Sequence, residues 1–140
     1  MQFFTEEEII HTLKFHRNIA VVGISEHMYR PSYGVTLAMI NNGYNIFPVN
    51  PKYEKVFDRR CYNTLLEIEE PIEIVNIFRR PQFVLPVVEE AIQIKAKVIW
   101  MQLGVVNNQA ARLAKDAGLI VIMDRCIKIE YAMNRDRILA

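Results

Sequence analysis

The chain has few of the features that would place it in a membrane, outside the cell or in a disulfide framework. It contains only two cysteines among 140 residues, and its longest apolar runs fall far short of the ~20 residues of a membrane span. Its first residues are acidic and lack the basic start and apolar stretch of a signal peptide. We therefore expect reduced thiols, a cytoplasmic location and no membrane contact.

An excess of basic charge is also missing, because 17 Lys and Arg residues face 16 Asp and Glu residues. Proteins that bind nucleic acid normally carry a strong basic excess, so we expect no nucleic-acid partner. No spacing of Cys and His indicates a metal site. Apolar residues make up 51% of the chain, which is typical of a folded core, and the length predicts one domain over residues 1–140.

What the sequence does contain is a regular alternation of short apolar runs and helical patterns. The runs that predict strands are residues 19–23, 44–49, 72–78, 97–102 and 119–123. The alternation predicts an α/β fold, a Rossmann-like three-layer domain with a five-stranded, mostly parallel sheet in the order 3-2-1-4-5. Pro48 indicates that the end of the second strand is not a central ladder position. A ligand would bind at the carboxyl ends of the strands, where this order reverses between the first and fourth strands.

The segment after the first predicted strand is suited to a phosphate. Gly23 lets a phosphate approach the backbone, and the following helix directs free N–H groups and its positive dipole end at that position. Ser25 and Ser32 supply hydroxyls, and Arg30 supplies a guanidinium. The alternative is a plain turn in which Ser32 is the helix N-cap. The segment is not a G-x-G-x-x-G motif, so it favours a dinucleotide only weakly.

Cationic residues follow the second and third predicted strands. Asn50 and Lys52 stand where an NAD site usually has an acidic residue for the ribose hydroxyls. A lysine there suits a phosphate on the ribose, although a solvated surface lysine remains the alternative. Phe78 and Arg79 follow the third strand with a second arginine, Arg80; they either flank a purine and its phosphates or face water.

The last two predicted strands end in small polar turns. Gln102 and Gly104 follow the fourth strand, and Cys126 follows the fifth. Cys126 is either a buried apolar side chain or a thiol that faces the ligand cleft, and under oxidising stress such a thiol would form a mixed disulfide with a ligand thiol near it. Because the five strand ends meet at one sheet edge, together they predict a phosphate-bearing, nucleotide-like ligand.

These segments resemble the small stand-alone CoA-binding proteins, whose fold is similar to the CoA-binding domain of the succinyl-CoA synthetase alpha subunit. The resemblance lies in residues 19–25, 30–34, 47–52, 78–81, 100–104 and 123–130. It implies that coenzyme A or an acyl-CoA binds at the carboxyl edge of the sheet. The binding residues that it implies are Gly23, Ile24, Ser25, Arg30, Pro31, Ser32, Tyr33, Asn50, Pro51, Lys52, Phe78, Arg79, Arg80, Gln102, Gly104 and Cys126.

The resemblance also implies a role for each group of residues. Gly23, Ser25 and the turn at 30–32 hold the pyrophosphate. Asn50 and Lys52 meet the ribose with its 3′-phosphate, and residues 78–80 border the adenine. Gln102 and Gly104 lie toward the pantetheine arm. A 3′-phosphate on the ribose accounts for a lysine where NAD sites have an acid.

Other functions stay open at this point. Lys52 suits the 2′-phosphate of NADP equally well, so an NADP-type oxidoreductase or a partner-dependent acyl-CoA enzyme is one alternative. A protein-interaction module is another, with a vestigial nucleotide cleft and an acidic partner for Arg59, Arg60, Arg79 and Arg80. The chain lacks the second domain and the phosphorylated histidine of the synthetases, so we expect binding without catalysis. The sequence leaves a homo-oligomer or an unknown protein partner open.

Overall fold

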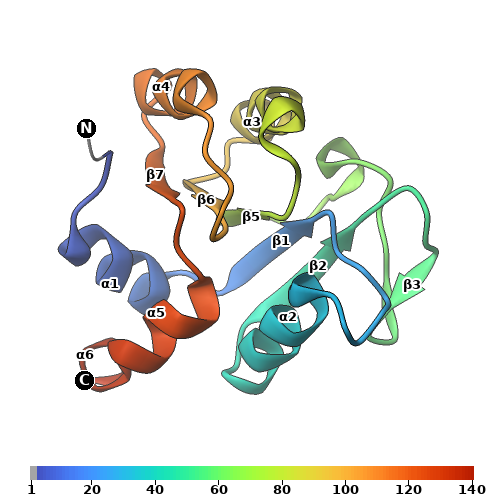
Figure 1. The fold of residues 1–140 in the computed structure, drawn as a ribbon, viewed down its shortest axis with the longest axis horizontal. Helices are drawn as coiled ribbons and strands as arrows, with labels where there is room; N and C mark the ends of the chain where they lie inside the picture. The colour runs from blue at the N-terminus through green and yellow to red at the C-terminus, as the bar shows by residue number, and fades with distance from the viewer. Residues whose placement is uncertain (1–2) are drawn as a thin grey trace.

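The computed structural model describes residues 3–140 and contains a five-stranded sheet with helices on both faces (Figure 1). Along the chain the elements are α1 (Glu6–Phe15), β1 (Asn18–Val22), α2 (Pro31–Asn41), β2 (Asn45–Val49), β3 (Lys55–Val56), β4 (Arg59–Arg60), η1 (Leu65–Glu67), β5 (Ile74–Ile77), η2 (Pro81–Phe83), α3 (Val84–Gln93), β6 (Val98–Met101), α4 (Asn108–Asp116), β7 (Ile120–Met123), α5 (Ile127–Met133) and α6 (Arg135–Leu139). None of the helices over residues 3–140 is both long and apolar enough to cross a bilayer.

The large sheet is parallel throughout, which confirms the predicted α/β, Rossmann-like class. Its strand order is β2-β1-β5-β6-β7. When the five strands are numbered 1 to 5 in chain order, the observed order is 2-1-3-4-5. We expected the third strand beside the second, but it pairs with the first. The order therefore reverses between β1 and β5, and the ligand crevice of such a sheet is expected there.

The chemistry of β2 explains this order. Pro48 has no N–H to donate to a further strand, and it lies near the end of β2. The outer edge of β2 is instead closed by a short return of the chain, in which the Tyr62 N–H donates to the Pro48 carbonyl at 2.9 Å and the Asn50 N–H donates to the Tyr62 carbonyl at 2.9 Å. β2 is thus an edge strand of the large sheet, and β5 pairs with the free side of β1.

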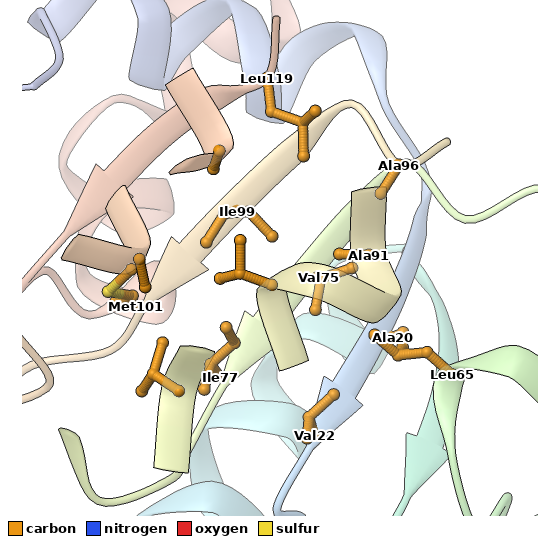
Figure 2. Packing of buried hydrophobic residues seen from close by; sticks show 14 of the residues in the cluster. Ala20, Val22, Leu65, Val75, Ile77, Ala91, Ala96, Ile99, Met101 and Leu119 are labelled. Atoms are coloured by element: carbon orange, nitrogen blue, oxygen red, sulfur yellow. The ribbon is translucent and has the colours of Figure 1, made fainter. Parts of the chain in front are cut away.

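Each face of the sheet carries its own apolar core, which is why the central strands are apolar on both sides. α1, α2 and α5 cover one face, and α3 and α4 cover the other (Figure 1). Figure 2 shows the second face, where side chains of β1, β5 and β6 meet Ala91 of α3. Both layers hold the strands so that their carboxyl ends form one rim.

A cleft at the carboxyl end of the sheet

The loops after β1, β2, β5, β6 and β7 enclose a cleft of about 800 Å³ at the carboxyl rim of the sheet. The sequence-predicted residues that line it are Gly23, Ile24, Ser25, Arg30, Pro31, Ser32, Asn50, Lys52, Phe78, Arg79, Arg80, Gln102 and Cys126. Tyr33, Pro51 and Gly104 lie outside its lining. The five strand ends are therefore brought together, as the expected parallel sheet requires.

Gly23 lies at the point where the strand order reverses, and it must be a glycine. Its φ is +89°, and a β-carbon at this position would clash with the carbonyl oxygen of Phe78. The Gly23 N–H donates to the Val49 carbonyl at 3.0 Å, while the Phe78 N–H donates to the Val22 carbonyl at 2.8 Å. Gly23 thus joins the ends of β1, β2 and β5 and lets the loops after β1 and β5 approach closely.

The turn between β1 and α2 is built from two serine hydroxyls. The Ser25 N–H donates to Ser32 Oγ at 3.0 Å, and the His27 N–H donates to Ser25 Oγ at 3.0 Å. Both oxygens accept from the backbone, so each hydroxyl can still donate its own proton to a ligand oxygen. Ser32 is not the N-cap of α2; that position belongs to Arg30, which makes no side-chain capping bond. Pro31 has no N–H and the Tyr33 N–H donates to the Arg30 carbonyl at 3.0 Å, so the start of α2 offers the Ser32 N–H and a positive dipole end to the cleft.

The charge of the cleft is one-sided. Arg30, Lys52, Arg79 and Arg80 line it, and none of the lining residues that the structure describes is an Asp or Glu. Within residues 3–140, none of these four cations forms a salt bridge. Unpaired cations close together raise the local positive potential and attract an anion. The polar end of the cleft is thus chemically suited to phosphate groups.

Asn50 lines the cleft but has its amide engaged within the protein. Its Nδ2 donates to the Ile24 carbonyl at 2.8 Å, and its Oδ1 accepts from the Lys52 N–H at 3.0 Å. The amide therefore fastens the loop after β2 to the loop after β1. Through these two bonds Asn50 holds the backbone of Lys52 at the rim of the cleft.

The other end of the cleft lies on β6 and β7. Gln102 is buried, and its Nε2 donates to Oδ1 of Asn76 at 2.9 Å. Cys126 is half-buried and lines the cleft. Gly104 has a φ of +85° and donates its N–H to Oδ1 of Asp124 at 2.7 Å, so it stabilises the rim from outside the lining. Tyr33 packs on the Phe57 ring, with 4.5 Å between ring centroids.

Sequence reasoning missed eight residues of the lining, most of them aromatic or apolar. These residues are His27, Tyr29, Val35, Tyr53, Phe83, Leu103, Val105 and Ile129. Leu103 and Val105 follow β6 directly, so the rule that led to Gln102 could have found them. Ile129 lies within helix α5, in the segment 123–130 that carries the resemblance, but it does not follow a strand end directly, so the strand-end rule does not find it.

Comparisons with known proteins show which family the chain belongs to. A family model described as a CoA binding domain matches residues 17–132. An uncharacterized protein of Bacillus subtilis, YneT, is 41% identical over 135 residues, which are 96% of this chain and 100% of that protein. The solved structure of a hypothetical protein from Pyrococcus horikoshii is 38% identical with a TM-score of 0.90, covering 98% of this chain and 94% of that one.

A larger relative is the ADP-forming acetate–CoA ligase of Methanocaldococcus jannaschii, which is 26% identical over 126 residues. The match covers 84% of this chain but 18% of that ligase. The similarity thus reaches one segment of the ligase. With the family match over most of its length, the chain belongs to the CoA-binding domain family.

Proposed function

We propose that this protein binds coenzyme A, free or as an acyl thioester, in the cleft at the carboxyl rim of the sheet. The observation that carries the proposal is the set of four cations without a carboxylate in the lining. Coenzyme A carries a pyrophosphate and a ribose 3′-phosphate, so it needs several positive contacts along one end. Family membership and the CoA-dependent activity named for the ligase relative support the same ligand.

Each end of the cleft takes a different part of the ligand in this proposal. The Ser25 and Ser32 hydroxyls and the start of α2 hold the pyrophosphate. Lys52, fixed by Asn50, meets the 3′-phosphate. The pantetheine arm then passes Gln102 toward Cys126, across the ends of β6 and β7.

Titration calorimetry with three ligands tests this function. We expect coenzyme A to bind, and dephospho-CoA to bind roughly tenfold more weakly, because one charge-assisted contact is worth about 1.5 kcal/mol. NADP, which carries its phosphate at the 2′-position, should bind no better than dephospho-CoA. Tighter binding of NADP would instead support the oxidoreductase alternative. Absence of binding for all three would favour the protein-interaction alternative, in which the basic residues meet an acidic partner.

A further inference from the structure

The lining of the cleft also includes an apolar wall that faces solvent. Phe83, Leu103 and Ile129 line the cleft there, and their exposed fractions are 54%, 66% and 48%. Val105 is buried beneath them in the same lining. Large apolar side chains gathered around a cavity and left in water mark a surface that a ligand covers.

The wall is built from two loops and helix α5, which hydrogen bonds hold together. Asn107 caps α4 by accepting from the Ala110 N–H, and its Nδ2 donates to the Pro81 carbonyl at 2.9 Å, which joins the loop of Phe83 to that of Leu103. The Gly104 N–H donates to Oδ1 of Asp124 at 2.7 Å, which joins the loop of Leu103 to the start of α5. These hydrogen bonds thus fix the segments that carry the wall residues relative to one another.

The backbone of Asp124 next to this wall has an uncommon conformation. It has a φ of +61°, a region that residues other than glycine seldom adopt. The carboxylate that receives the Gly104 N–H belongs to this residue, so two left-handed residues meet in one hydrogen bond. This bond fixes the backbone after β7 beside the loop after β6, which carries Leu103.

We infer that the ligand of this cleft is an acyl-CoA whose acyl group is an apolar chain, seated against Phe83, Leu103 and Ile129. The inference rests on the proposed function, which directs the thiol arm past Gln102 and Cys126. Leu103 follows Gln102 directly, and Ile129 lies one helical turn beyond Cys126. A thioester extends the arm toward this wall, and an apolar chain there removes exposed apolar surface from water.

Calorimetric titration with acetyl-CoA, butyryl-CoA and hexanoyl-CoA tests the inference on the full chain. A fully buried methylene is worth up to about fourfold in Kd. The wall remains partly open to solvent, so we expect about 1.8-fold in Kd for each of the four methylenes by which hexanoyl exceeds acetyl. Hexanoyl-CoA should then bind about tenfold more tightly than acetyl-CoA.

Two variants link this gain to the wall. Leu103→Gln and Ile129→Gln change exposed side chains, and each should lower the ratio of the acetyl-CoA to the hexanoyl-CoA Kd to about threefold or less. Leu66→Gln is the matched control, because Leu66 lies in η1 outside the cleft lining. Its side chain is 47% exposed, nearly the same fraction as the 48% of Ile129. It should leave the ratio at about tenfold.

The outcomes separate the inference from the function on which it rests. Equal Kd values for the three thioesters would overturn the apolar-chain inference and leave coenzyme A binding intact. A ratio that falls as much in Leu66→Gln as in Ile129→Gln would also overturn it. Absence of binding for every thioester and for free coenzyme A would overturn the proposed function itself.

Discussion

At the scale of single residues, Gly23 decides whether the cleft can form. Replacing it by alanine forces a β-carbon toward the Phe78 carbonyl oxygen and leaves a φ of +89°, which alanine adopts only with strain. Gly118→Ala is a matched control, since Gly118 has a φ of +91° and its added β-carbon would meet no atom within 4 Å.

We predict that Gly118→Ala lowers the free energy of unfolding by about 1–2 kcal/mol, the cost of a left-handed alanine. Gly23→Ala should cost at least about 3 kcal/mol, because the clash adds to the same strain. Urea unfolding of both variants measures the difference. Equal losses in the two would mean that the close approach of β1 and the Phe78 loop does not constrain position 23.

The two cysteines differ in their surroundings, and this predicts different reactivity. Cys61 is buried, and burial raises the pKa of its thiol although its Sγ lies 3.4 Å from the Asn50 carbonyl. Cys126 is half-buried on the cleft. Since the thiolate is the reactive form, iodoacetamide should modify Cys126 well before Cys61, and coenzyme A should slow the modification of Cys126. Peptide mass spectrometry reads both sites, and faster labelling of Cys61 contradicts the prediction.

At the scale of elements, Glu73 clamps the start of β1 beside the start of β5. Its carboxylate accepts from the Arg17 N–H at 2.9 Å and the Asn18 N–H at 3.1 Å, and Nδ1 of His16 lies 2.8 Å away. Burial acts to raise the pKa of Glu73, but these two backbone N–H groups and His16 outweigh it and lower the pKa below its ordinary value. The ionised clamp therefore favours the folded state.

The lowered pKa of Glu73 predicts how stability depends on pH. A carboxylate whose pKa is lowered on folding stabilises the fold above its unfolded pKa of about 4.3, and the stabilisation is lost as the pH falls through the lower, folded value. We predict that Glu73→Gln costs about 1–3 kcal/mol at pH 6 and that this difference shrinks as the pH falls below about 4.

Unfolding curves between pH 6 and pH 3 test the clamp. Glu69→Gln is the control, because Glu69 is exposed on the same approach to β5 and makes no hydrogen bond among the described side chains. Its difference from the wild type should stay near zero across the range. A constant gap between the wild type and Glu73→Gln at every pH would refute the account of the clamp.

At the scale of the whole molecule, the sequence carries the class of the fold but not its strand order. Apolar runs covered on both faces read directly as buried parallel strands, and each run lies at one of the five strands of the large sheet. The order depends on which edge a strand joins, and that choice comes from long-range pairing. Pro48 held the local clue, since a strand that cannot donate there suits an edge.

The cleft residues also divide into those that the sequence could predict and those that it could not. Residues that directly follow a strand could be predicted because parallel strands end at one rim, and most of them do line the cleft. Phe83 and Ile129 could not, because they reach the cleft from helical turns whose position depends on the packed layers. Tyr33 turns toward Phe57, which only the tertiary structure brings beside it.

The central claim is that the cation of Lys52 meets the 3′-phosphate of coenzyme A, and a double cycle tests it most directly. Coenzyme A and dephospho-CoA are titrated into the wild type, Lys52→Ala and Lys115→Ala. Lys115→Ala is the control, because Lys115 is an exposed residue of α4 outside the cleft lining. We predict that Lys52→Ala weakens coenzyme A roughly tenfold and dephospho-CoA less than twofold, while Lys115→Ala changes neither. Equal loss for both ligands in Lys52→Ala, or no loss for either, would contradict the claim.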